Sequence, residues 1–217
     1  MTASAIAPGT DVRDLFRAAY ENRYTWEPGF AGYRGICEWQ QGERLVRGRF
    51  QVGADLRGTV EDIDDAEVEK ALQQQLWEVC IHRVRRPFEQ THADNTFTAA
   101  SLESTGLEIE VGGRSAGDRY RIADDVVTMV HRHIHGTVVT IHTEEITETG
   151  SGYLSRRYSS RYSDPSNGEP KGPSQRFVDT FAPLGDGGPW VLQERVVSAD
   201  DGTEPVSFRF LDLEALG

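Results

Sequence analysis

Four of the six histidines in this chain of 217 residues lie within one short segment, at His131, His133, His135 and His142. Imidazole nitrogens bind zinc, copper, iron and nickel, and histidine also serves as a general acid or base near neutral pH. The spacing therefore indicates a metal centre or a polar, titratable wall of a binding cavity. A simpler interpretation, a strand with a solvent-exposed histidine face, stays open beside these two.

The local backbone decides which of these histidines come together. A continuous strand over residues 126–143 places His131, His133 and His135 on one face, but both faces of such a strand are mixed. A two-residue type I′ turn at His135-Gly136 instead pairs residues 126–134 with residues 137–145, because both turn residues tolerate positive φ. We favour this hairpin because one of its faces is coherently apolar. That face holds Val126, Val130, Ile134, Val139 and Ile141, and the other holds Val127, Met129, His131, His133, Val138, Thr140, His142 and Glu144.

The hairpin brings three imidazoles within reach of one metal ion. His131 lies opposite Thr140 and diagonal to His142, and His133 follows on the same face. We expect His131, His133 and His142 to bind copper, iron, zinc or nickel with one coordination position open, as catalysis at a metal requires. His135 is the alternative ligand, and Glu144 is the carboxylate that supports the site. Such a centre is compatible with an oxidoreductase or a cyclase, although no residue pattern decides whether the protein is an enzyme.

Other side chains are candidates for contacting an organic ligand. Arg156 and Tyr158 share one side of a predicted strand, where a guanidinium beside a phenol suits an anionic or aromatic molecule. Met129, Tyr24 and Trp26 complete the predicted ligand-binding set. The alternative for the arginines of this strand is ion pairing with the acidic residues of the preceding strand. These acidic residues are Glu144, Glu145 and Glu148.

The elements that position these residues follow from capping and periodicity. Asp11 begins a short amphipathic helix over residues 11–22, and alternating strands follow over residues 30–63. A long helix is predicted over residues 65–86, capped near Asp65 and ended by Pro87. Residues 95–213 alternate with period two between frequent turn signals, which is typical of an antiparallel meander.

This order of elements predicts an α+β fold in one domain, residues 1–217. We expect a strongly curved antiparallel sheet of about 10–12 strands, a barrel or half-barrel, wrapped around the long helix. Curved sheets commonly enclose a cavity for a small molecule. The leading hypothesis is therefore a small-molecule-binding protein with a histidine-lined, metal-containing cavity. The alternative is a non-enzymatic carrier of an apolar ligand such as a lipid or a pigment.

Composition limits the classes of partner. The chain has 23 Lys and Arg against 35 Asp and Glu, a formal net charge of −12, so nucleic acid and anionic membranes are poor partners. No run approaches the roughly 18 apolar residues of a membrane span, and the first residues lack a secretory pattern, so we expect a cytoplasmic protein. Cys37 and Cys80 are expected to be small buried apolar residues. The oligomeric state stays open.

Three segments carry a resemblance to a known family. They are AYENRYTW at residues 19–26, RHIHGTVV at residues 132–139 and GYLSRRY at residues 152–158. With these segments the chain resembles, over nearly its whole length, an uncharacterised family familiar from cyanobacteria, a domain of unknown function. The resemblance implies a single domain and supplies neither an activity nor site residues.

Overall fold

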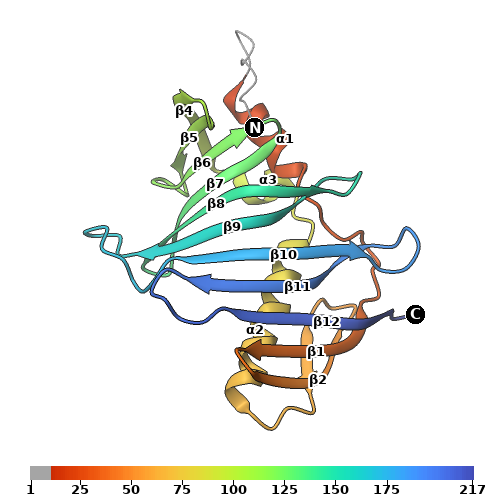
Figure 1. Ribbon diagram of the computed structural model, residues 1–217. Coiled ribbons are helices and arrows are strands. Elements are labelled where there is room, and N and C mark those ends of the chain that lie inside the picture. Colours follow the sequence, from red (N-terminus) through yellow and green to blue (C-terminus); the bar gives the residue numbers. More distant parts are fainter. Residues whose placement is uncertain (1–10) are drawn as a thin grey trace. The chain divides into compact units, whose positions relative to one another are not determined.

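The computed structural model describes residues 11–217. The chain divides into two compact units, and each joins segments that are distant in the sequence (Figure 1). The first unit contains the residues up to Tyr24 and Arg86–Arg176. The second unit contains Thr25–Arg85 and Phe177–Gly217. Each unit is described by itself.

The first unit combines two helices with six strands. Its helices are α1 (Val12–Glu21) and α3 (Phe88–His92). Its strands are β4 (Asn95–Glu103), β5 (Gly106–Gly113), β6 (Arg119–Ala123), β7 (Val126–Ile134), β8 (Thr137–Glu148) and β9 (Tyr153–Ser163). These six strands are neighbours in chain order, and each neighbouring pair is antiparallel, so they form the predicted meander.

The second unit combines one longer helix, α2 (Ala66–Arg83), with six strands. The strands are β1 (Tyr33–Gln41), β2 (Arg44–Val52), β3 (Gly58–Glu61), β10 (Gln175–Pro183, whose first two residues belong to the first unit), β11 (Trp190–Ala199) and β12 (Val206–Ala215). Their order is β3-β2-β1-β12-β11-β10. Twelve mostly antiparallel strands confirm the predicted number. Of the two predicted forms, barrel and half-barrel, the closed barrel does not form, because β3 and β4 each have one strand neighbour among the described residues.

Each unit has its own helix over its own strands. Helix α1 begins after Asp11, whose side chain accepts a hydrogen bond from the Arg13 backbone amide at 2.8 Å, and it packs against β4 and β7. Its Phe16 and Ala19 are fully buried in the core of the first unit. The core also contains Phe88, Leu107, Ile109, Val111, Tyr120, Ile122 and Val127.

Helix α2 begins where the sequence predicts. The Asp65 side chain accepts from the backbone amides of Glu67 and Val68, and the helix ends at Arg83, a little before the predicted stop at Pro87. It packs against β1 and β3, lying across one face of the strands of its unit (Figure 1). Because α1 packs on the strands of the first unit, the expectation of one sheet wrapped around a single helix is not confirmed.

The β7–β8 hairpin forms in the predicted register. His135 and Gly136 have φ values of 47° and 74° in the connecting turn, and His131 lies opposite Thr140. Val127 departs from the predicted faces. A register shift between β6 and β7 pairs Arg121 with Met129 but Ile122 with Val127, so Val127 turns into the apolar core.

Cys37 and Cys80 are free and buried, as predicted. Burial raises the pKa of the Cys37 thiol to about 11 and that of Cys80 to about 12. Both are therefore protonated packing residues at neutral pH. Within residues 11–217, no helix combines the length and the apolar character needed to cross a membrane.

Candidate functional site

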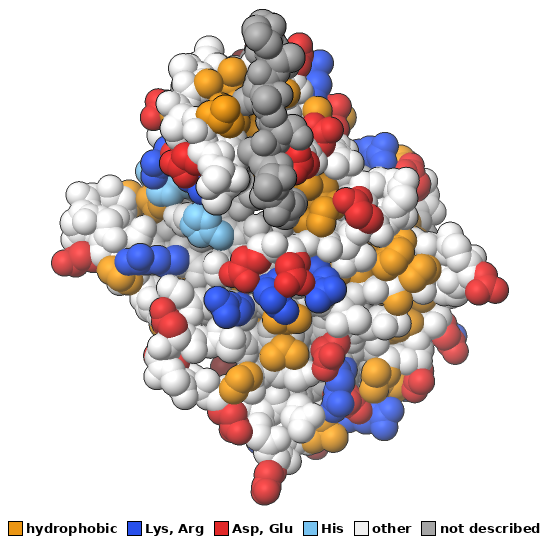
Figure 2. Space-filling model, turned by 45° about the horizontal axis from the view of Figure 1, so that its top comes forward, with side chains coloured by type: hydrophobic (Ala, Val, Ile, Leu, Met, Phe, Trp, Pro, Cys, Tyr) orange, Lys and Arg blue, Asp and Glu red, His pale blue; other side chains and the backbone are white. Residues whose placement is uncertain are grey.

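The predicted site residues of the hairpin lie on the face of β6–β9 that points away from α1. We call this surface the histidine face; histidine side chains are exposed on the side of the molecule shown in Figure 2. One row across it runs from Arg119 through His131 and Thr140 to Arg161, each directly opposite the next. The adjacent row contains Arg121, Met129, His142 and Ser159. The two predicted ligands His131 and His142 therefore share a face, as expected.

Hydrogen bonds hold the imidazoles of this face in separate environments. His131 Nδ1 and Thr140 Oγ1 are 2.9 Å apart. His133, whose ring centroid is 5.8 Å from that of His131, directs Nδ1 to Asp118 Oδ1 at 3.3 Å. Asp118 is nearly inaccessible, and it also accepts from the His133 backbone amide and from Arg132 Nε. His131 and His133 are thus engaged by different partners.

The predicted three-histidine metal centre is not supported. No group of three or more His, Cys, Asp or Glu side chains has a metal-binding arrangement in the described part of the chain. The physical reason is that His131 is engaged by Thr140, His133 turns to Asp118, and His142 projects from the neighbouring row opposite Met129. The alternative ligand His135 lies in the exposed turn.

The electrostatic surroundings keep two of these histidines neutral. Burial lowers the pKa of His131, and the nearby Arg119 and His133 lower it further. Burial and then Arg121 lower the pKa of His142. At neutral pH both rings are uncharged, so they act as neutral hydrogen-bonding groups.

The remaining predicted ligand contacts are used within the fold. Arg156 and Arg157 both pair with Glu145, at 3.0 and 2.8 Å, which confirms the cross-strand alternative for these two arginines. Tyr158 lies opposite Thr143 on β8. In the first unit, Tyr24 is buried, and its backbone amide donates to the Tyr153 carbonyl. In the second unit, Trp26 is buried, and its indole Nε1 donates to the Trp190 carbonyl at 3.0 Å.

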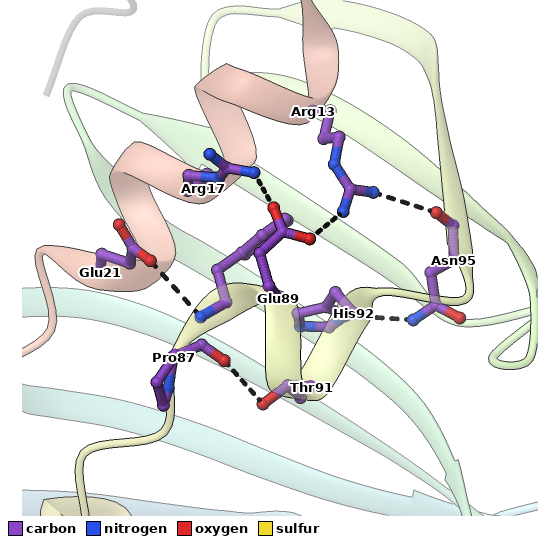
Figure 3. Close-up of polar contacts among 9 residues, drawn as sticks. Arg13, Arg17, Glu21, Pro87, Glu89, Thr91, His92 and Asn95 are labelled. Carbon is purple, nitrogen blue, oxygen red and sulfur yellow. Dashed lines mark hydrogen bonds and ion pairs between the residues drawn. The ribbon is translucent and has the colours of Figure 1, made fainter.

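A fifth histidine is buried beside α1. His92 ends α3 within an aromatic cluster that includes Phe16 and Phe88, and Asn95 Nδ2 donates to its Nδ1 at 3.1 Å (Figure 3). Burial and nearby arginines lower its pKa to about 4. His92 is therefore a neutral core residue at pH 7.

Ion pairs join α1 to α3 above this cluster. Glu89 accepts from both Arg13 and Arg17, and Glu21 accepts from the Phe88 backbone amide (Figure 3). These contacts fix the two helices of the first unit to each other at their exposed side.

A second candidate site lies in the second unit, beneath α2, and sequence reasoning missed it. The strand face that α2 covers is rich in buried aromatic side chains. They are Tyr33, Trp39, Phe50, Phe177, Phe181, Phe208 and Phe210. Ring contacts link several of them, for example Tyr33 to Phe50 at 5.5 Å and Phe50 to Phe210 at 5.1 Å between centroids. The helix contributes buried Val68, Leu72, Leu76, Val79 and Cys80.

One polar network interrupts this apolar layer. Arg195 on β11 is 5% exposed and binds Asp179 on β10 through two hydrogen bonds, at 2.8 and 2.7 Å. Its Nη1 also donates to Gln75 and Glu78 of α2, at 3.0 and 3.1 Å. We call these four residues the polar latch, because they connect the helix to the strands beneath it.

The latch has no local sequence signal. Gln75 lies 120 residues before Arg195, and the Arg195–Asp179 pair spans two strands in a segment that otherwise alternates regularly. An aspartate at an apolar-facing strand position, with an arginine at a similar position on the next strand, is the one pattern that points to it.

Comparisons with known proteins place the chain in a family. No curated protein matches it. Among solved structures, the chain is similar to the crystal structure of a LolA superfamily protein from Nitrosomonas europaea, with a TM-score of 0.35. The two sequences are 11% identical, and the match covers 96% of this chain and 95% of that chain. A domain of an outer membrane lipoprotein-sorting protein from Vibrio parahaemolyticus has 9% identity and a TM-score of 0.32, over 94% and 91% of the two chains.

A third solved structure, a DUF1329 family protein from Desulfovibrio piger, has 6% identity and a TM-score of 0.28 over 94% of this chain and 91% of that chain. At TM-scores below 0.5, function has to be argued from the geometry of this chain itself. The family is shown by sequence: with residues 7–216 matched, the chain belongs to the family described as "Protein of unknown function (DUF3386)".

Proposed function

We propose that this protein carries an apolar small molecule, of the lipid or pigment class, between α2 and the aromatic strand face of the second unit. The observation that carries the proposal is the polar latch. A helix that only completes a core is held by apolar side chains, whereas α2 is also connected to the strands through a buried arginine.

The surface beneath α2 suits an apolar ligand. Its aromatic side chains offer large contact areas with few polar atoms, which is typical of pockets for apolar molecules. The buried faces of Leu72 and Leu76 line the other side of this layer. Displacement of the helix replaces these two contacts with contacts to the ligand, so the apolar area stays covered.

The geometry of the latch also keeps the free-energy cost of displacing α2 low. Breaking the bonds from Arg195 to Gln75 and Glu78 leaves the two-bond Arg195–Asp179 pair intact. The buried guanidinium therefore keeps its counter-ion when the helix moves, and no unpaired buried charge results. Gln75 and Glu78 become solvated at the same time, which offsets most but not all of the free energy of the two lost hydrogen bonds.

The proposal is tested with an apolar fluorescent probe, N-phenyl-1-naphthylamine, and the double variant Gln75→Ala/Glu78→Ala. We expect the wild-type chain to bind the probe saturably. In the double variant, stopped-flow fluorescence should show association faster by about tenfold, because two net hydrogen bonds that close α2 are absent.

The control is Lys70→Ala, which removes a long polar side chain from the exposed side of the same helix. It should associate at the wild-type rate. Absence of saturable probe binding to the wild-type chain contradicts the carrier proposal, and so does an equal association rate in the double variant. Mass spectrometry of an organic extract of the untagged purified protein identifies any ligand retained from the cell.

A further inference from the structure

Six residues of the histidine face form a block across three adjacent strands of the first unit. They are His131 and Met129 on β7, Thr140 and His142 on β8, and Arg161 and Ser159 on β9. His131, Thr140 and Arg161 are directly opposed in one row, and Met129, His142 and Ser159 in the next. We call this set the donor block, because five of its six side chains can donate hydrogen bonds.

The dimensions of the block match one small anion. Directly opposed residues have Cβ atoms about 4.5–5.5 Å apart, and residues two apart along a strand are separated by roughly 6.5–7 Å. Met129 is buried at one corner of the block and gives that corner an apolar surface. The polar side chains beside it can reach a tetrahedral oxyanion together.

Hydrogen bonding prepares His131 and Thr140 as a pair. When the Thr140 hydroxyl donates to His131 Nδ1, at 2.9 Å, the neutral imidazole carries its proton on Nε2. Nε2 is then a donor for a bound oxygen atom. The arrangement supplies a donor without requiring a charged histidine.

The charges around the block favour an anion on its β9 side. The exposed Arg161 guanidinium has no ion-pair partner within residues 11–217, whereas Arg119 and Arg121 both contact Glu108, at 3.4 and 2.8 Å. Glu110 lies opposite Arg119 at the β5 side. The block itself contains no carboxylate.

One carboxylate lies close to the block on β8. Glu144 offsets part of the lowering of the His142 pKa by burial and Arg121, and it pairs with Arg176 at 3.8 Å. Its charge is therefore offset by a guanidinium on its own side. Of the two rows, the one with His131, Thr140 and Arg161 therefore carries the positive charge of the block, on the Arg161 guanidinium.

We propose that the donor block binds a small oxyanion of the phosphate class, with the Arg161 guanidinium as the charged ligand and His131 Nε2–H as a neutral donor that the Thr140 hydroxyl orients. The anion is either inorganic phosphate or the phosphate headgroup of a lipid. This site lies wholly in the first unit and does not depend on the apolar site proposed for the second unit.

Calorimetric titration with inorganic phosphate at constant ionic strength tests the site. We expect saturable binding to the wild-type chain and a loss of about tenfold or more in affinity for Arg161→Gln, the size expected for a charged hydrogen bond. Thr140→Val should weaken binding by a smaller factor. The control Arg156→Gln changes an exposed arginine of the same strand that is paired with Glu145, and it should bind like the wild-type chain.

A second arm distinguishes the two sources of the anion. Phosphatidic acid vesicles are compared with phosphatidylcholine vesicles in a flotation assay, with the same variants. Arg161-dependent binding of inorganic phosphate supports a free-anion site, and Arg161-dependent binding of phosphatidic acid vesicles alone supports a headgroup site. The proposal is overturned when neither probe binds saturably, or when Arg161→Gln binds as tightly as the wild-type chain.

Discussion

Two rows of side chains, one on each unit, cross strands on the face that points away from the unit's helix. In the second unit the row runs from Arg47 through Glu38 and Arg209 to Glu194, with charges alternating from strand to strand. Glu38 pairs with Arg209 at 2.9 Å and with Arg47 at 3.6 Å.

In the first unit the corresponding row is Arg119, His131, Thr140 and Arg161, and no carboxylate stands between its two guanidiniums. Cross-strand pairs of opposite charge stabilise a sheet; Arg119 has such a partner in Glu108, and Arg161 has none within residues 11–217. The comparison therefore separates a row that serves stability from one whose charge is available to a ligand.

The helices α1 and α2 differ in how they are held on the strands of their units. In the first unit, α1 lies on a continuous apolar core, and its ion pairs to α3 are at the surface. In the second unit, α2 is connected to the strands by a buried network around Arg195. Buried polar contacts in the second unit thus hold the helix that covers an apolar face, whereas α1 is a fixed part of its core.

The largest expected effect concerns the latch. Arg195→Met leaves the buried Asp179 carboxylate without its counter-ion, and we expect a loss of about 3–5 kcal/mol in the free energy of unfolding. Urea denaturation followed by circular dichroism measures this change. The double variant Arg195→Met/Asp179→Leu should recover most of the loss, because it removes both charges. A double variant as unstable as the single one would show that the charge pair is not the source of the effect.

The next effect concerns the core under α1. His92 has a folded-state pKa of about 4 against a model-peptide value of 6.5, so the unfolded chain binds the proton first as pH falls. The stability that comes from neutral His92 is complete above pH 6.5 and is lost between about pH 6.5 and pH 4, on the order of 3 kcal/mol.

The measurement is the pH dependence of the unfolding free energy of the wild-type chain minus that of His92→Gln. We expect this difference to fall with decreasing pH across that interval. A difference independent of pH contradicts the buried neutral state of His92.

A smaller effect concerns how closely α2 approaches β3. A Cβ atom on Gly58 would lie 2.7 Å from Leu76 Cβ, so Gly58→Ala should displace the helix and lower the unfolding free energy by about 1–3 kcal/mol. Thermal and urea unfolding measure the change. The association rate of the apolar probe should rise in the same variant, and an unchanged stability would show that α2 is free to adjust.

The smallest expected effects come from substitutions in the two rows of side chains, one in each unit. Glu38→Gln leaves two arginines without their shared carboxylate and should lower the unfolding free energy by about 1 kcal/mol. Arg161→Gln removes no ion pair formed within residues 11–217, so its unfolding free energy should stay within about 0.5 kcal/mol of the wild-type value. Equal losses from both substitutions in urea denaturation would remove the distinction between the rows.

Local signals predict much of this fold. Asp65 caps α2 as expected, and the His135-Gly136 turn fixes the hairpin register because its backbone requires positive φ at both residues. The bulge that turns Val127 inward is not visible in an alternating pattern, because it depends on how β6 and β7 pair. Helix α3 is too short to show a helical period.

The candidate sites are harder to predict from the sequence than the fold is. The shared face of His131 and His142 follows from the register, but the metal centre does not, because side-chain partners such as Thr140 and Asp118 decide where each ring points. The contact between Gln75 and Arg195 joins residues that only the tertiary fold brings together.

Hydrogen–deuterium exchange of α2 and α1, with and without N-phenyl-1-naphthylamine, tests the central claim most directly. If α2 is a releasable cover over an apolar binding face, its amides exchange faster in Gln75→Ala/Glu78→Ala than in the wild-type chain. Exchange in α2 also changes when the probe binds, and exchange in α1 stays the same. Exchange of α2 that responds to neither the double variant nor the probe would contradict the account.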